Sequence, residues 1–407
     1  MKNIFKNIGP ATLIAAAFIG PGTVTLCSIA GVNFGYNLLW AMLLSIVATI
    51  VLQEMAARLG VVTQKGLSEV LREEIKNPFF KIVSAILIIS AIVIGNAAYE
   101  AGNISGGVLG LSTIAPEYSF IIGNYSVNYL NLLIGAAAFI LLYIGNYKVL
   151  ERSLIVLVIL MSVSFVLTAI ITKPNIVSIF KGIFIPKFPE NSILTIIGLV
   201  GTTVVPYNLF LHASLVKEKW HNKSDLPLVR KDTVIAVFVG GIVSMAIIIS
   251  ASASNLTSIN SAIDLAKGLE PLYGQAAKYF LAIGLFAAGI TSAITAPLAA
   301  AYVIKGIFGW NDGLKSKKFK AVWMFILFLG VLFSSLKIKP IEIIKFAQIT
   351  NGILLPIISG FLLWIMNKKH VLGKYSNNIT QNIFGFIILV LTIFLGVKSI
   401  WKVFVTF

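Results

Sequence analysis

The sequence predicts an all-α integral membrane protein, and three observations support this prediction. The 407 residues are 58% hydrophobic and only 12% charged, with a mean hydropathy of +0.94. A soluble domain has about a quarter charged residues, so this composition cannot cover a water-facing surface. The apolar residues also lie in runs of about 20, the length with which a helix crosses the hydrocarbon core. Alternating ten-residue segments, which mark an outer-membrane barrel, are absent.

The apolar runs predict eleven membrane spans. The two longest connections between them, 105–129 and 254–276, are too short to hold an independent catalytic fold. The predicted spans are approximately 10–32, 36–58, 80–104, 130–147, 153–172, 192–216, 233–253, 277–307, 320–336, 342–367 and 382–403.

Lysine and arginine are unevenly divided between the two sides of this topology. One set of alternate loops, together with the N-terminus, holds 22 of the 32 basic residues, and the other set holds 10. Basic residues collect on the cytoplasmic side of membrane proteins. The N-terminus is therefore expected in the cytoplasm and the C-terminus outside, in a multi-pass protein of the plasma membrane. The net charge of +17 reflects this loop distribution, so no nucleic-acid partner is expected.

Two spans contain helix breakers at their middle. The first reads Gly-Pro-Gly-Thr at 20–23, and the sixth reads Gly-Thr-Thr-Val-Val-Pro at 201–206. Proline lacks an N–H and glycine has little helix preference, so each break frees backbone groups at membrane depth. Such groups are tolerated where protein or a water-filled cavity satisfies them. Breaks in spans 1 and 6 correspond if spans 1–5 and 6–10 are inverted repeats, which predicts a midplane binding site of a secondary transporter.

Four motifs give the chain a resemblance to a known family, the NRAMP divalent-metal transporters. They are Gly20–Thr23 with the following Phe34–Trp40, Leu52–Thr63, Gly201–Ala213 and Ala347–Pro356. The resemblance covers nearly the whole chain. It implies the LeuT fold of two inverted five-helix repeats plus an eleventh helix. The single domain, 1–407, would then comprise a first repeat at about 8–173, a second at about 190–367 and the extra helix at about 380–405.

The resemblance also indicates the substrate site. In the family an Asp and an Asn of the first helix bind the metal with an Ala carbonyl and a Met sulfur of the sixth helix and a Gln of the tenth. Gln is retained here, whereas the other four positions differ. The candidate substrate-binding or metal-ligating residues are Gly20, Thr23, Thr202, Val205, Gln348 and Asn351.

These replacements leave two hypotheses for the solute. A carboxylate attracts a divalent cation about 4 Å away by roughly 8 kcal/mol at an effective dielectric of 20, and this attraction is lost with Gly20. The thioether that favours soft metals is lost with Val205. The neutral oxygens that remain suit a hydrated hard cation such as Mg²⁺ better than dehydrated Mn²⁺ or Fe²⁺. Alternatively, the amides after Gly20–Gly22 could accept the carboxylate of a small organic acid or amino acid.

Coupling residues are expected inside the spans. Glu100 matches the Glu of the family's Asp-x-x-Glu, and an intramembrane carboxyl group is a candidate proton carrier. His212 could relay protons, while Tyr207 is expected to line the pocket. Thr291 and Ser292 lie where sodium-coupled relatives of the fold place hydroxyl ligands, so coupling to H⁺ and coupling to Na⁺ are both considered. No other cofactor is expected.

Other classes of function have less support. The sequence contains no H-E-x-x-H, G-x-S-x-G or P-loop motif, and its histidines, His212, His221 and His370, are too scattered for a metal-ligand set, so no enzyme is expected. A transport-inactive sensor of the same fold is the other alternative. The oligomeric state is left open, with a monomer plausible. At the end of the second span, Glu54 and Arg58 are spaced for an i,i+4 ion pair or a gate contact.

Overall fold

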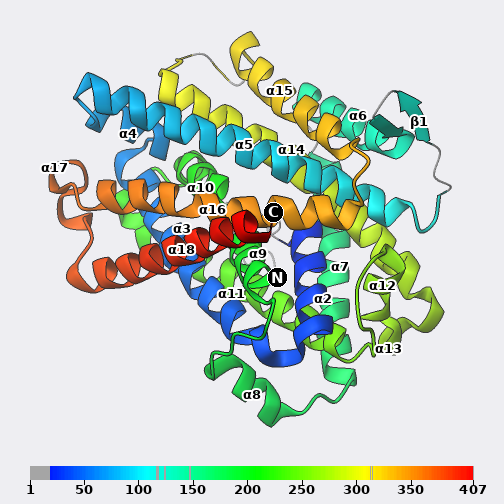
Figure 1. Ribbon diagram of the computed structural model, residues 1–407. Helices are drawn as coiled ribbons and strands as arrows, with labels where there is room; N and C mark the ends of the chain where they lie inside the picture. Colours follow the sequence, from blue (N-terminus) through cyan, green and yellow to red (C-terminus); the bar gives the residue numbers. More distant parts are fainter. Residues whose placement is uncertain are drawn as a thin grey trace.

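The computed structural model describes residues 19–115, 119–122, 125–145, 148–311, 313 and 315–406. Within these ranges the protein is a helical bundle, and the sheet is one antiparallel hairpin of β1 (Ser119–Ile122) and β2 (Tyr125–Asn128) (Figure 1). The helices are α2 (Pro21–Phe34), α3 (Leu39–Thr63), α4 (Leu67–Glu74), α5 (Pro78–Leu111), α6 (Tyr129–Ile144), α7 (Lys148–Ile171), α8 (Ile176–Phe184), α9 (Ile193–Thr203), α10 (Pro206–Lys219), α11 (Leu226–Ser252), α12 (Ala262–Lys267), α13 (Glu270–Tyr273), α14 (Ala277–Phe308), α15 (Lys317–Ser334), α16 (Pro340–Met366), α17 (Lys369–Leu372) and α18 (Ile379–Thr406), with short 3₁₀ turns that include η2 (Gly35–Leu38).

Eight helical stretches of the described chain are long and apolar enough to cross a membrane. One of them, Pro21–Thr63, runs through two of the predicted spans. With the shorter helices α6 and α15, a helix is present at each of the eleven predicted spans. The prediction of an all-α membrane fold is confirmed. Residues 10–18 of the first predicted span lie outside the described residues.

The long helices α5 and α14 lie side by side, and α16 packs against α5 from another direction (Figure 1). Glycine permits the close approach of α5 and α14. A Cβ added to Gly289 would lie 2.8 Å from the Cα of Gly107, which is closer than real Cβ contacts allow. A glycine also allows α2 and α11 to pack closely, because a Cβ on Gly31 would lie 2.3 Å from the carbonyl oxygen of Ile248.

The third predicted span was wrong in its length. It was expected to end at 104, but α5 continues to Leu111. Glycine is a poor helix former, yet two glycines in this extension lie against neighbouring helices. A Cβ on Gly106 would lie 2.1 Å from Cβ of Pro21, and one on Gly110 would lie 2.7 Å from the carbonyl oxygen of Ala282. Packing therefore maintains the helix where local propensity predicts a loop.

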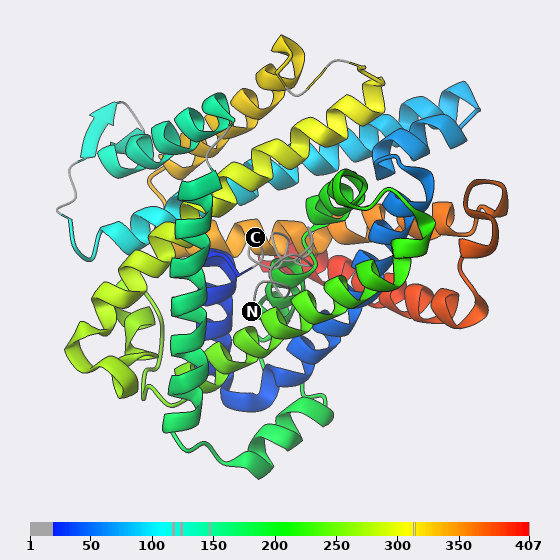
Figure 2. The same ribbon diagram turned by 180° about the vertical axis from the view of Figure 1, so that it is seen from behind.

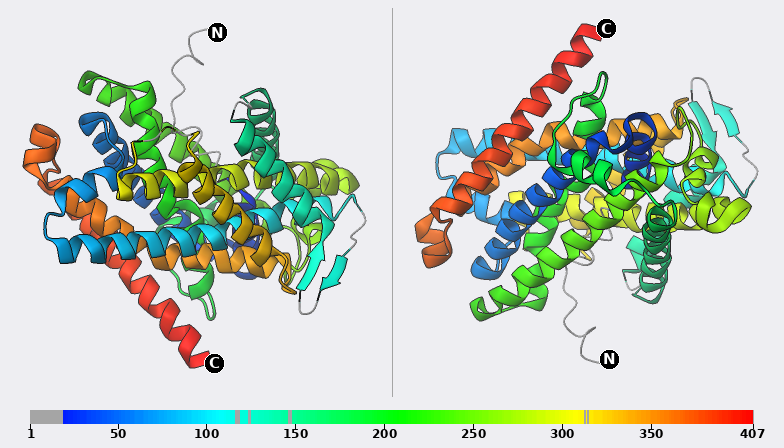
Figure 3. Two further views of the ribbon diagram at one scale, coloured as in Figure 1. Left: turned by 90° about the horizontal axis from the view of Figure 1, so that it is seen from above. Right: turned by 90° about the horizontal axis from the view of Figure 1, so that it is seen from below.

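Several loops contain short helices that hydropathy did not indicate. Figure 2 shows α8, α12 and α13 at the periphery of the bundle. α8 is held against η2, since a Cβ on its Gly182 would lie 2.2 Å from the carbonyl oxygen of Tyr36. Nearby, Trp40 Nε1 donates to the carbonyl of Lys187 at 3.0 Å. The last helix, α18, runs along the outside of the bundle (Figure 3) and packs against α16.

Candidate functional site

The break in the first span is a helix start. Gly20 is in an extended conformation and is the N-cap of α2, and Pro21 is the first helical residue. Proline suits this position because it has no N–H to lose. The first turn of a helix has no intrahelical acceptors for its N–H groups, and no side chain of the described residues caps α2. The sequence Gly-Pro-Gly thus presents the positive end of a helix dipole inside the protein.

The break in the sixth span is a two-residue interruption. α9 ends at Thr203, Val204 and Val205 have non-helical backbone angles, and α10 begins at Pro206. Both valines are fully buried. The last turn of α9 lacks intrahelical donors for its carbonyl groups. The negative end of α9 and the positive start of α10 therefore meet at this point.

The two breaks meet through their threonines. Thr23 Oγ1 and Thr202 Oγ1 are 2.8 Å apart and hydrogen bonded, although the residues are 179 positions apart in the sequence. Both side chains have no exposed surface. Thr23 and Thr202 were both predicted as substrate-binding residues, and this hydrogen bond places them together between α2 and α9.

α16 supplies the third wall of the site. A Cβ on Gly22 would lie 2.1 Å from Nε2 of Gln348, so the Gln348 amide lies directly against the first turn of α2. On the other side, a Cβ on Gly201 would lie 1.9 Å from the carbonyl oxygen of Gln348. Gln348 Oε1 is buried and has no hydrogen-bond partner among the described residues. Buried carbonyl oxygens are normally satisfied, so this atom is available to a ligand or a water molecule.

Asn351 lies one helical turn further along α16 and faces α5. Its Oδ1 would be 3.7 Å from a Cβ on Gly95, and its Nδ2 is buried without a hydrogen-bond partner in the described part of the chain. The six candidate residues lie at the start of α2, at the end of α9, in the break before α10 and in α16. They are Gly20, Thr23, Thr202, Val205, Gln348 and Asn351. Among the described residues, no group of three or more His, Cys, Asp or Glu side chains could hold a metal ion.

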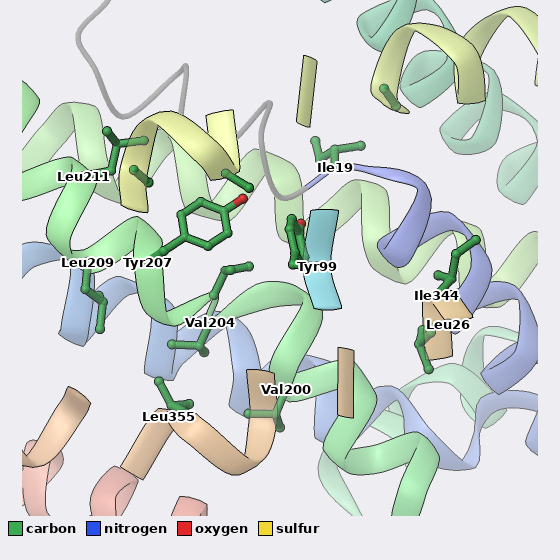
Figure 4. Packing of buried hydrophobic residues seen from close by; sticks show 14 of the residues in the cluster. Ile19, Leu26, Tyr99, Val200, Val204, Tyr207, Leu209, Leu211, Ile344 and Leu355 are labelled. Atoms are coloured by element: carbon green, nitrogen blue, oxygen red, sulfur yellow. The ribbon is translucent and has the colours of Figure 1, made fainter. Parts of the chain in front are cut away.

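Tyr207 forms part of an aromatic pair beside the breaks. Its ring centroid is 5.3 Å from that of Tyr99 of α5, in an edge-to-face arrangement. Figure 4 shows the two rings side by side, with Ile19 above them and Val204 below in this view. Both tyrosines are buried. Tyr207 thus lies beside the break before α10, and its role as a pocket wall stays a prediction.

Glu100 of α5 is fully buried, and its side chain faces α15. A Cβ on Gly330 of α15 would lie 2.2 Å from Glu100 Cγ, so the side chain packs between α5 and α15. Glu100 Oε2 accepts a long hydrogen bond of 3.4 Å from Asn103, and Oε1 has no partner among the described residues. No ion pair involving Glu100 occurs in the described part of the chain. The carboxyl group is thus close to Tyr99 in sequence, but it packs against α15.

His212 and the α14 hydroxyl of Thr291 have hydrogen-bond partners of their own. His212 Nδ1 is hydrogen bonded to Gln53 Oε1 of α3 at 2.8 Å, and Nε2 is buried without a partner among the described residues. Thr291 Oγ1 donates to carbonyl groups of its own helix, at Ala287 and Ala288, both at 3.0 Å. Ser292 is fully buried in α14.

Sequence reasoning missed two polar residues near these groups. Asn208, in the first turn of α10, is buried, and neither of its amide atoms has a partner among the described residues. Gln53 is the partner of His212. The sequence did offer a signal for both residues, because each is an uncharged amide inside an apolar span. Burying an amide group costs free energy unless it is hydrogen bonded.

The predicted pair at the end of α3 is confirmed as part of a larger network. Arg58 Nη2 lies 3.1 Å from Glu54 Oε2, and Arg230 Nε of α11 donates to Glu54 Oε1 at 2.8 Å. Arg58 is 1% exposed and also donates to the carbonyl of Tyr375 at 2.9 Å and to Asn377 Oδ1 at 2.7 Å. This network ties α3 to α11 and to the segment between α17 and α18.

Paired helix breaks that meet inside a bundle of membrane-spanning helices define a transporter of the LeuT-fold class. The chain belongs to the Nramp family: the family model described as "Natural resistance-associated macrophage protein-like" matches residues 11–402. The predicted family, fold and transporter class are therefore confirmed.

The chain is also similar to an individual protein in sequence and to solved structures in fold. The chain is 28% identical over 386 residues to the divalent metal cation transporter MntH of Verminephrobacter eiseniae, covering 91% of this chain and 83% of the relative. A crystal structure of the Eremococcus coleocola manganese transporter is similar with a TM-score of 0.76 at 18% identity, covering 98% of this chain and 88% of that one. The nucleobase-cation-symport-1 family transporter Mhp1 is similar with a TM-score of 0.58 at 14% identity, covering 98% and 93%.

Proposed function

We propose that this protein transports a divalent metal ion and holds it, with part of its water shell, at the junction of α2, α9 and α16. The observation that carries the proposal is Gln348 Oε1, a buried carbonyl oxygen beside the start of α2 with no partner among the described residues. The relatives named as divalent metal cation transporters support the choice of a metal. They do not favour the alternative of an organic acid or amino acid.

The donor set favours a hard cation. The hydroxyl groups of Thr23 and Thr202, the amide of Gln348 and the carbonyl end of α9 are neutral oxygen donors. The negative end of α9 favours a cation, whereas the positive starts of α2 and α10 favour the oxygen atoms of its retained waters. Mg²⁺ releases its water reluctantly and is bound with several waters retained. Neutral oxygens can bind such a hydrated ion through its waters, whereas a soft transition metal would gain from the sulfur that Val205 does not supply.

Uptake into proteoliposomes tests the proposal. Mg²⁺, Mn²⁺ and a mixture of amino acids would be offered separately to the wild-type protein, to Gln348→Ala and to a matched control, Gln275→Ala, whose side chain is exposed. We expect metal uptake with Mg²⁺ preferred, a loss of at least tenfold in Gln348→Ala because a buried hydrogen-bonding group is removed, and no change in Gln275→Ala. Amino-acid uptake without metal uptake would contradict the proposal.

We further propose that protons drive this transport and that Glu100 carries them. Glu100 is a buried carboxyl group inside a span, and its Oε1 has no partner among the described residues. Intramembrane carboxyl groups of this kind occur in proton relays. Thr291 donates its hydroxyl hydrogen to its own helix, which leaves its oxygen lone pairs available, so coupling to Na⁺ is the alternative that the experiment must test. Uptake that persists without a pH gradient and requires sodium would overturn proton coupling.

The membrane orientation is part of the same proposal. The distribution of 22 and 10 basic residues supports a cytoplasmic N-terminus and an external C-terminus in the plasma membrane. In this orientation the Glu54–Arg58–Arg230 network lies on the cytoplasmic side. Labelling of cysteines introduced at Lys76 and at Ser258 in intact cells would check it, since only the second should react with an impermeant reagent.

A further inference from the structure

A pocket lies between α5 and α16, at the place where these two helices separate. Further along the pair, glycine allows close contact. A Cβ on Gly102 would lie 3.0 Å from Cβ of Ala347, and one on Gly95 would lie 2.9 Å from Cδ1 of Leu354. Figure 1 shows the two helices diverging from there toward α4 and α17. The space between the separated ends has a volume of about 710 Å³.

Apolar side chains form both walls of this pocket. The lining comes entirely from two continuous segments, 74–87 and 357–364. Within each helix its apolar members recur at a spacing of three or four residues, so each helix turns one stripe toward the pocket. The stripes are Phe80, Val83 and Leu87 of α5 and Ile357, Phe361 and Trp364 of α16.

The pocket opens to the outside of the bundle and has the depth of one bilayer leaflet. Phe80, Leu87 and Trp364 are 61%, 42% and 38% exposed, although they belong to membrane-spanning helices. The lining extends along α5 from Asn77 to Leu87, which is about 15 Å at about 1.5 Å per residue. Half of the hydrocarbon core is also about 15 Å thick. An acyl chain of a single leaflet can therefore lie along these walls.

Two lysines lie at the end of the pocket nearest to α4 and α17. Lys76 is exposed and belongs to the lining just before α5 begins. Lys368 Nζ lies 4.5 Å from the centroid of the Trp364 ring, which lines the opposite wall. Neither lysine forms an ion pair in the part of the chain that the structure describes. Tryptophan and lysine at the end of an apolar surface are typical of the level of lipid headgroups.

The carboxylates near this end have partners of their own. Glu74 is the one acidic residue in the described lining, and its Oε2 is hydrogen bonded to His370 Nε2 at 2.5 Å. Its neighbour Glu73 is paired with Lys65 at 2.5 Å. Even with a neutral His370, the two lysines outnumber the one carboxylate of the lining. This end of the pocket is therefore positive, which complements a negatively charged headgroup.

We propose that the pocket between α5 and α16 binds an anionic phospholipid, with its phosphate at Lys76 and Lys368 and an acyl chain along the apolar walls. Basic pockets between membrane helices on the cytoplasmic side bind such headgroups, and this end is cytoplasmic in the proposed orientation. Glu100 and Asn351 lie further along the same two helices. The lipid thus packs between two helices that carry residues proposed for coupling and for substrate binding.

Lipid binding to the purified full-length chain tests this proposal directly. Native mass spectrometry and thermal unfolding would compare phosphatidylglycerol with phosphatidylcholine of the same acyl chains. One variant combines Lys76→Gln with Lys368→Gln, and the other is Val83→Trp, which fills the pocket from a half-buried position. The matched control combines Lys315→Gln with Lys317→Gln, two exposed lysines of the loop before α15.

We expect phosphatidylglycerol to be retained and to raise the Tm, and phosphatidylcholine to have little effect. The variant without Lys76 and Lys368 should bind phosphatidylglycerol roughly thirtyfold more weakly, since one lysine near an anionic surface accounts for about fivefold. Val83→Trp should abolish binding, and the control should behave as wild type. Equal binding of the two lipids, or unchanged binding without the two lysines, would overturn the proposal.

Two other occupants are distinguished by the same measurements. Inorganic phosphate would be added at the concentration of the lipid, and an equal rise of the Tm would show that a free anion suffices. A second copy of the chain would appear as a dimer in the mass spectra. A dimer that Val83→Trp dissociates, with phosphatidylglycerol binding unchanged, would show that the pocket is a subunit interface. Either result would refute a lipid site.

Lipid binding to this pocket is independent of transport. Phosphatidylglycerol binding is measured on the purified chain without any metal ion or pH gradient. A failure of this proposal would therefore leave the proposed function untouched, and a failure of metal uptake would leave the lipid site untouched.

Discussion

The contact between α9 and α16 provides the sharpest test of how the site is built. A Cβ on Gly201 would lie 1.9 Å from the carbonyl oxygen of Gln348 and 2.7 Å from the amide nitrogen of Gly352. Both atoms belong to the backbone of α16, so no side chain can rotate away. Gly201→Ala must therefore push α9 and α16 apart by about 1 Å to bring its Cβ to the 3.0 Å below which real contacts essentially never occur.

Overpacking of this kind costs about 1–3 kcal/mol, which raises the unfolding equilibrium constant by about 5- to 150-fold. The same movement carries Thr202 away from Thr23, to which it is hydrogen bonded at 2.8 Å. We therefore expect Gly201→Ala to have a lower Tm and to lose most of its metal uptake, including in the fraction that remains folded.

Gly360→Ala is the matched control, because Gly360 lies in the interior of α16 and the nearest atom to its added Cβ is 3.9 Å away. Alanine is the better helix former by about 1 kcal/mol, so this variant should be as stable as wild type or more so. The two variants would be compared by thermal unfolding in detergent and by uptake into proteoliposomes. If Gly201→Ala were as stable and as active as Gly360→Ala, the close approach of α9 and α16 would be disproved.

Three further predictions concern the buried polar groups. Thr23→Ala should reduce metal affinity more than Thr23→Ser, which keeps the hydroxyl; equal affinities in a titration would show that the hydroxyl does not contribute. Glu100→Gln keeps the shape of the side chain but cannot release a proton, so uptake should lose its dependence on the pH gradient; a retained dependence would exclude this residue as the carrier. Glu54→Gln should destabilise the protein by about 1–3 kcal/mol, because the buried Arg58 loses a charged partner; thermal unfolding should show a smaller loss for Glu342→Gln, whose partner is exposed.

The location of the two helix breaks could be predicted from sequence, but the contacts between them could not. Proline and glycine act on the backbone locally, so the starts of α2 and α10 could be placed from Pro21 and Pro206. The hydrogen bond between Thr23 and Thr202 depends on how two distant helices pack. The identity of Gln348 could be read from the tenth-helix motif, whereas its position against Gly22 required the structure.

The residues that we propose for coupling show the limit of sequence patterns more clearly. Hydropathy identified Glu100 as an unusual charge within a span, and this is correct, since it is fully buried. The side of α5 on which it lies depends on the rotation of that helix, which is fixed by contact with Gly330. Likewise, the sequence shows His212 only as a histidine in an apolar helix. The structure shows that its Nδ1 is hydrogen bonded to Gln53 Oε1 of α3 at 2.8 Å.

The sequence by itself determined the class of the protein, because the lengths of apolar runs and the positions of helix breakers are local properties that a bilayer constrains strongly. The tertiary structure alone decided which groups meet. It placed Gln348 beside the start of α2, buried Glu100 against α15, and left a pocket between α5 and α16. These outcomes depend on the rotation and close approach of whole helices, which the packing of glycine and side chains decides.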